Sequence, residues 1–144
     1  MQVIGVAVGI VLVLVFVLAV CALLTALSGW SDLAERFAAS KSIDGTRFRF
    51  GTVTMGRGLS TAAFLNHNFV TIGVNGLYLS TLLPIGPPLL IPWTEIESME
   101  PQRGLLSSGC LITIRNFKPQ ITLYGEPGRN AREAFEHALS VSAP

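Results

Sequence analysis

The sequence predicts an α+β protein: one N-terminal transmembrane helix, then a strongly bent antiparallel sheet or small barrel of six to seven strands, capped by a C-terminal helix. Three observations predict this. Residues 3–24 are apolar throughout, and the first charged residue of the 144 is Asp32. From residue 46 onward, short β-rich segments follow one another at roughly 10-residue spacing. The last segment places Ala131, Ala134, Phe135, Ala138 and Leu139 on one helical stripe.

The composition excludes several classes of protein. Half of the residues are hydrophobic, 13% are charged, and ten Lys and Arg against nine Asp and Glu leave a net charge of +1. A disordered tail, a coiled coil or a nucleic-acid-binding arm needs more charge or fewer apolar residues, so no nucleic-acid partner is expected. We expect three units: a transmembrane helix over residues 1–28, a short amphipathic helix and linker over 29–45, and one domain over 46–144.

Residues 3–24 read VIGVAVGIVLVLVFVLAVCALL. As a helix this stretch is roughly 33 Å long, against about 30 Å of bilayer hydrocarbon, so it is long enough to span. Trp30 follows at the place of an interfacial aromatic anchor. Gly5 and Gly9 have the spacing that lets two helices approach closely, which suggests self-association or a transmembrane partner.

A cleaved secretory signal is the competing interpretation. The sequence lacks a basic segment before the apolar run, and the run exceeds the usual length of a signal core. However, residues 26–28 resemble a small-residue cleavage site, and residues 18–21 partly resemble a lipoprotein box. We favour an uncleaved single span.

The flanking charges predict the orientation. Arg36, Lys41 and Arg47 follow the span within about 20 residues, and no Lys or Arg precedes it. We therefore expect a single-pass protein of the inner (plasma) membrane with its N-terminus outside and its C-terminal domain in the cytoplasm. Cys21 lies in the span and Cys110 stands alone, which leaves no intrachain disulfide framework for a secreted domain.

Helical spacing of Trp30, Leu33 and Phe37 predicts a short amphipathic helix, with Ser31 as its cap. Its apolar face either lies on the membrane interface or packs on the domain, and we favour packing. From residue 46 the period changes to two, and a phase shift at Gly51 predicts a β-bulge. Residues 59–65 fit a weak strand or a loop.

Asn75-Gly76 between two β-rich runs predicts a hairpin with a two-residue type I′ turn. Residues 84–88 interrupt the pairing with three prolines, and further strands are expected near residues 89–91, 94–100, 111–115 and 120–124. The closing helix is expected to begin at Asn130, with Glu133 completing a capping box.

This order of elements resembles the pleckstrin-homology (PH) superfold, in particular small bacterial PH-like and GRAM-like domains. The resemblance lies in residues 75–79, in the segment LIPWTEI at residues 90–96 and in the closing helix. Residues 29–37 are also similar to segments of small bacterial membrane proteins. The resemblance implies a binding or scaffolding role and supplies no catalytic residues.

Candidate contact residues are few. Arg47 and Arg49 on the first strand, with Arg57 in the turn that follows, provide a weak attraction for anionic headgroups. Solvated charges on an outer strand face are the plainer interpretation. Leu105 and Leu106 occupy an expected loop tip, where they either touch a partner or the membrane or fold back on the core.

No catalytic motif is apparent. Cys110 has no patterned histidine partner, and His67 and His137 lack further ligands at metal-binding spacing, so no metal or other cofactor is expected. We therefore expect a non-catalytic, membrane-anchored adaptor or scaffold whose domain binds a protein partner near the membrane. The alternative is a module that responds to lipid headgroups.

Overall fold

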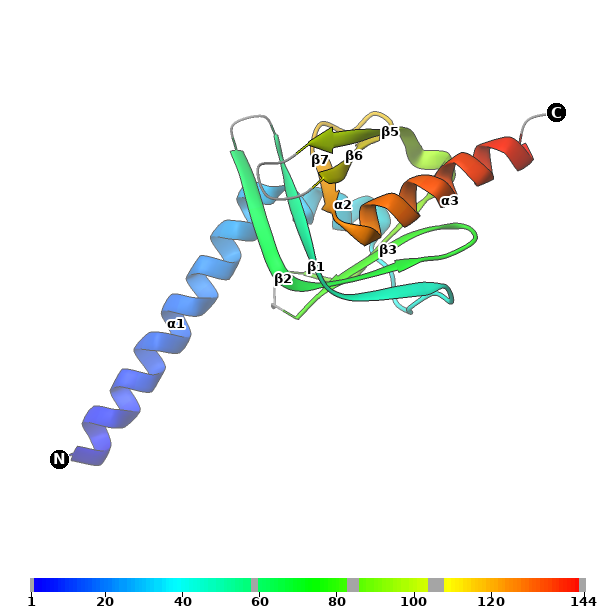
Figure 1. The fold of residues 1–144 in the computed structure, drawn as a ribbon. Coiled ribbons are helices and arrows are strands. Elements are labelled where there is room, and N and C mark those ends of the chain that lie inside the picture. Colours follow the sequence, from blue (N-terminus) through cyan, green and yellow to red (C-terminus); the bar gives the residue numbers. More distant parts are fainter. Residues whose placement is uncertain (1, 58–59, 83–85, 104–107, 143–144) are drawn as a thin grey trace.

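The computed structural model describes residues 2–57, 60–82, 86–103 and 108–142. These residues form three α-helices and a curled, seven-stranded antiparallel sheet, in which helix α1 projects away from a domain built of everything else (Figure 1). The expected α+β layout is confirmed. The helices are α1 (Gln2–Ser28), α2 (Trp30–Phe37) and α3 (Glu126–Ser142).

The sheet follows the chain order except at one junction, where β1 pairs with β7 and gives the order β4-β3-β2-β1-β7-β6-β5. Its strands are β1 (Thr46–Arg57), β2 (Ser60–Ile72), β3 (Gly76–Thr81), β4 (Leu89–Pro92), β5 (Ile96–Arg103), β6 (Ser108–Ile114) and β7 (Gln120–Tyr124). Of the segment left open between a weak strand and a loop, residues 60–65 are part of β2, and residue 59 lies outside the described residues. A turn of 3-10 helix, η1 (Trp93–Glu95), follows Pro92 and separates β4 from β5.

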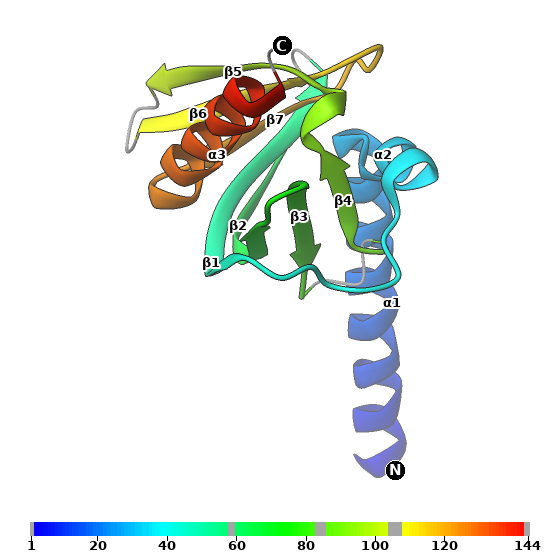
Figure 2. The ribbon, with the colours of Figure 1, turned by 90° about the vertical axis from the view of Figure 1, so that its right-hand side faces the viewer.

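The long strands β1 and β2 bend and so belong to both halves of the sheet. The first part of β1 pairs with β2 alone, while residues 53–56 pair with β2 on one side and β7 on the other. The result is a half-barrel, and α3 lies across its β5-β6-β7 side (Figure 2). Ala131 and Phe135 bury the inner face of α3 in the common core, where Phe135 packs against Trp93.

The expected bulge lies where the period shifts. Arg49 pairs with Phe69 and Gly51 with Asn68, so Phe50 is the extra residue of β1. Phe50 takes a left-handed conformation with φ 59°, which is strained for a bulky side chain. The bulge turns its ring outward, where it is 59% exposed and packs beside Phe69.

The β2-β3 hairpin is confirmed, but its expected type I′ turn is wrong. Gly73 N–H donates to Gly76 O at 3.0 Å, which makes Val74 and Asn75 the central residues of the turn. Asn75 and Gly76 are not among the described residues with positive φ. Gly76 is needed for another reason: a Cβ there would lie 2.5 Å from the backbone oxygen of Ile91 on β4.

Helix α2 packs on the domain, as favoured, and its Trp30, Leu33 and Phe37 belong to the core. The expected role of Trp30 as an interfacial anchor is wrong: the side chain is 1% exposed, and its indole N–H donates to Pro87 O at 3.0 Å. Ser31 is not the cap, because the helix begins at Trp30 after Gly29, which has φ 77° and leaves no side-chain cap.

Helix α3 begins at Glu126, four residues before the expected cap, Asn130. Pro127 suits a first helical turn, since its fixed φ fits a helix and the missing N–H has no partner there. The Asn130 side chain instead donates to Glu126 O within the helix. Leu139, assigned to the buried stripe, is 52% exposed because α3 extends beyond the sheet at its C-terminal end (Figure 1).

Candidate functional site

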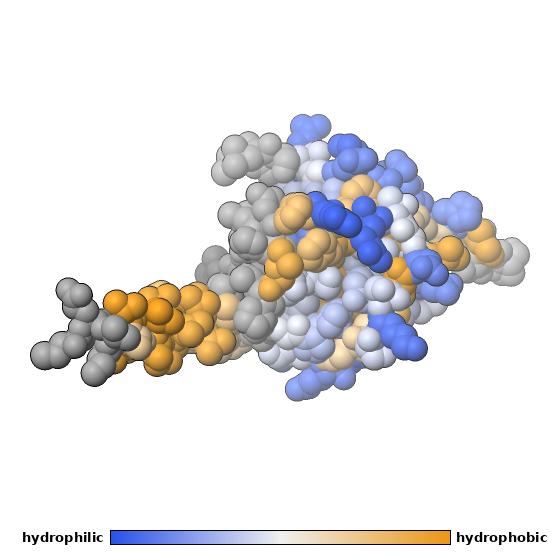
Figure 3. All heavy atoms as spheres, turned by 90° about the horizontal axis from the view of Figure 1, so that it is seen from below, coloured by the Kyte–Doolittle hydropathy of each residue, from blue (hydrophilic) through white to orange (hydrophobic). Residues whose placement is uncertain are grey.

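Helix α1 is long and apolar enough to cross a membrane over Gly5–Leu23, 19 residues that are almost wholly unburied in the protein. A signal sequence meets the same criteria of length and composition. The apolar surface along α1 dominates one end of the molecule, and a second apolar area lies at the opposite end beside the C-terminus (Figure 3). Gly5 and Gly9 lie on the exposed part of α1, where an added Cβ meets nothing within 4 Å.

The C-terminal part of α1 is built into the domain. Cys21 is 5% exposed and belongs to the core cluster, and α1 packs against α2, β1 and β2. Only Gly29 separates α1 from α2. The span therefore continues directly into the folded domain with no flexible segment between them.

One end of the sheet carries a hollow of about 370 Å³ on the outer face of β1, β2 and β3, which we call the basic hollow because Arg47 and Arg49 line it. Two cross-strand rows form it: Arg47 pairs with Thr71 and Thr71 with Tyr78, while Arg49 pairs with Phe69 and Phe69 with Ser80. Ser42 completes the rim. Thr71 and Tyr78 are buried and make the base of the hollow, whereas both arginines are exposed.

The structure brings together two of the three candidate arginines. Arg57 pairs with Ser60 at the other end of β1, ten residues from Arg47, which is about 30 Å along an extended strand. Its side chain, like Leu105 and Leu106, lies outside the described residues. Within the described part of the chain, neither Arg47 nor Arg49 makes an ion pair.

An apolar groove of about 440 Å³, which the sequence analysis missed, separates the β2-β3 turn from the C-terminal half of α3. The turn supplies Val74, η1 supplies Trp93, and α3 supplies Ala134, Ala138 and Val141. Val74 is 90% exposed and Val141 72% exposed. His137 is the only ionisable residue in the lining that the structure describes.

A third hollow, also about 440 Å³, lies between β5-β6 and α3 and contains Cys110. Burial raises the pKa of this thiol above its ordinary value, and Arg132 opposes the shift to a smaller extent. Arg132 is itself held by Glu136 at 2.8 Å. The neutral thiol is therefore the favoured form of Cys110, which suits packing better than nucleophilic attack.

Among the residues that the structure describes, no three His, Cys, Asp or Glu side chains gather as a metal site. Comparison of the chain with known protein families and with curated proteins finds no match. Three features of the described structure are candidates for contact with other molecules: the apolar helix, the basic hollow and the apolar groove.

Proposed function

We propose that this protein is a non-catalytic adaptor, anchored in the inner membrane by α1, whose domain binds a protein partner through the groove between the β2-β3 turn and α3. The observation that carries the proposal is the groove, in which Val74 and Val141 are exposed. The C-terminal end of α3, whose second half forms one side of the groove, lies remote from the free end of α1 (Figure 1). Leaving a large apolar side chain in water is unfavourable by about 1.5–3 kcal/mol relative to burial.

The packing of α1 supports a permanent anchor over a cleaved signal. Cleavage at residues 26–28, or just before Cys21, would remove part of the helix that covers β1 and β2. A segment that completes a folded core contributes to its stability, whereas a signal peptide is discarded. The 19 residues of Gly5–Leu23 extend about 28 Å as a helix, close to the thickness of bilayer hydrocarbon.

The cytoplasmic placement of the domain follows from positive charge close to the span. Arg36 lies on α2, directly after α1, and Arg47 is the second residue of β1. Basic residues flanking a span remain on the cytoplasmic side. The half-barrel capped by α3 is compatible with the PH-like fold, and we assign the domain to that superfold, whose small bacterial members the sequence resembles.

The groove suits an apolar segment of another membrane protein. Its described lining is mostly valine, alanine, glycine and tryptophan, with Asn75, Thr94 and His137 as the polar members and no Asp, Glu, Lys or Arg, so it offers little to a charged ligand. Anchoring confines both proteins to two dimensions and raises their effective concentration, so that a modest apolar contact suffices for binding.

Site-specific photo-crosslinking in cells tests this proposal. A photoreactive amino acid at Val74 or Val141 should give one adduct of defined mass, identified by mass spectrometry. A probe at the exposed Glu97 of β5 serves as the control for random collision. Substitution V141D, at an exposed residue of the groove, should abolish the adduct at Val74 while membrane integration and thermal stability are unchanged. The same adduct at Glu97, or none at either groove position, would overturn the proposal.

A further inference from the structure

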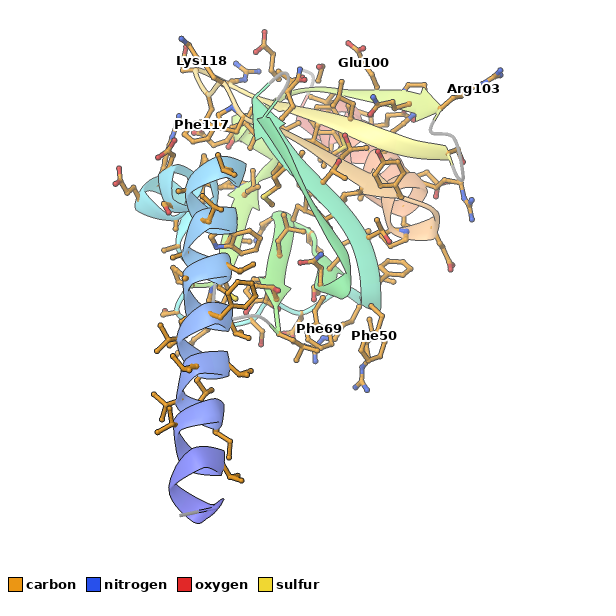
Figure 4. The ribbon with its side chains drawn as sticks, turned by 90° about the vertical axis from the view of Figure 1, so that its left-hand side faces the viewer. Phe50, Phe69, Glu100, Arg103, Phe117 and Lys118 are labelled. Carbon is orange, nitrogen blue, oxygen red and sulfur yellow. The ribbon has the colours of Figure 1, made fainter. Side chains whose placement is uncertain are left out.

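The end of the sheet that carries the basic hollow lies toward the N-terminal half of α1. Phe50 and Phe69 mark this end, whereas Glu100 and Arg103 lie at the other (Figure 4). If Gly5–Leu23 fills the hydrocarbon, the domain that begins to pack at Cys21 rests against the membrane surface. Arg47, Arg49 and Phe50 then lie on its membrane-facing side.

The two arginines are arranged to hold one anion. Positions i and i+2 of a strand point to the same face, about 6–7 Å apart, and two guanidinium groups at this spacing can reach one phosphate. Arg47 and Arg49 line the same hollow over the buried, hydroxyl-bearing Thr71 and Tyr78. No carboxylate lines it among the described residues.

The bulge adds an apolar element beside this charge. Phe50 holds a strained φ of 59° and leaves its ring 59% exposed next to Phe69. Leu82, directly after β3, is 60% exposed. Residues with a strained backbone cluster at functional sites. An exposed phenylalanine beside basic groups suits the interface between headgroups and acyl chains, where apolar rings enter the membrane and basic groups stay at its surface.

We propose that the hollow of Arg47, Arg49, Thr71 and Tyr78 binds the phosphate of an anionic membrane lipid, with Phe50 inserted at the interface beside it. The site orients the domain on the bilayer. The inference rests on the proposed membrane anchoring by α1 and is independent of the proposed partner groove. A phosphate-bearing lipid is favoured over a soluble phosphate ester because the exposed Phe50 adjoins the arginines.

Native mass spectrometry of the detergent-solubilised full chain measures this directly. The chain is titrated with phosphatidic acid, with phosphatidylcholine as a lipid of zero net charge, and with glycerol 3-phosphate as a soluble ester. R47Q/R49Q should weaken the binding of phosphatidic acid about thirtyfold, since each basic residue near an anionic surface contributes about fivefold. F50A should weaken the binding of phosphatidic acid and leave the binding of glycerol 3-phosphate unchanged.

The matched control is R103Q/R115Q, which also removes two exposed arginines, on β5 and after β6. Its affinity for phosphatidic acid should stay within twofold of the unsubstituted chain. If both double variants lose the same affinity for phosphatidic acid, the lipid is attracted by the total charge of the protein, and the proposed site is overturned. If glycerol 3-phosphate binds as tightly as phosphatidic acid, the bound phosphate need not come from a membrane lipid, and the proposal is overturned on that point. Carbonate extraction of each variant, which should show full membrane retention, separates failure of this site from failure of the anchor.

Discussion

At the scale of single residues, two tryptophans join segments that are far apart in the chain. The Trp93 indole N–H donates to Val74 O at 2.9 Å and closes the β2-β3 turn onto η1. The Trp30 indole N–H donates to Pro87 O, 57 residues away, and fixes α2 to the segment before β4. Both rings are buried, whereas Val74 and Pro87 are exposed residues, so each indole N–H finds its acceptor at the edge of the core.

We predict that Trp30→Phe lowers the free energy of unfolding by about 1–3 kcal/mol, because the smaller ring leaves a gap in the core and the hydrogen bond to Pro87 O is lost. Chemical denaturation of the full chain in detergent, followed by circular dichroism, measures the change. Leu139→Ala, at an exposed position of α3, should change stability by no more than about 0.5 kcal/mol. Unchanged stability of the Trp30 variant with weaker membrane retention would restore an anchoring role for this side chain.

Tryptophan is common both at membrane interfaces and in cores, and the sequence around residue 30 favoured the interface because the span ends just before it. The deciding contact, Pro87, belongs to a distant segment. Arg47 and Arg49 could be predicted as a pair because strand alternation is local. Their separation from Arg57 depends on the length of β1, which the expected turn at residues 56–58 made too short.

At the scale of elements, the β2-β3 hairpin shows which structural features can be predicted from neighbouring residues in the sequence. Alternation predicted the strands on both sides of the turn, and a shift of period predicted the bulge before Gly51. The turn type could not be predicted, because β4 approaches Gly76 so closely that the backbone of Ile91 leaves no room for a Cβ. The apolar groove was missed for a similar reason: the β2-β3 turn and the end of α3 meet only after folding.

Gly76→Ala should therefore lower the free energy of unfolding by about 1–3 kcal/mol through crowding against β4. Gly51→Ala is the matched control: its nearest contact would be Val70 Cγ2 at 3.5 Å, ordinary packing distance, and its φ is not positive. We expect that control to change stability by less than about 1 kcal/mol. Equal losses in the two variants would show that glycine flexibility, and not the approach of β4, decides both positions.

At the scale of the whole molecule, the junction of α1 and α2 determines how the domain meets the membrane. A flexible linker would let the domain rotate freely, but Cys21 is packed in the core and α1 lies against β1 and β2. Orientation is then a property of the fold. The basic hollow and one side of the apolar groove belong to the same β2-β3 hairpin, while the other side of the groove, the C-terminal half of α3, extends away from α1 (Figure 1). The two proposals together would have one protein contact lipid and partner at the same time.

Spin labels at two positions test this orientation in proteoliposomes. We predict that a nitroxide on Phe50→Cys is more accessible to oxygen than to a water-soluble nickel chelate, and that one on Glu100→Cys shows the reverse. These residues lie at opposite ends of the sheet (Figure 4). Cys21 and Cys110 are buried, so the unsubstituted chain should take up little label and sets the background.

A glycine-serine insertion after Ser28, between α1 and α2, is the control for rigid coupling. It should reduce the difference in accessibility between the two labels, because the domain is then free to tumble about its anchor. Similar accessibility at positions 50 and 100 without the insertion would mean that α1 does not fix the domain. The labels report depth alone, so this result would stand whether or not Arg47 and Arg49 bind a lipid phosphate.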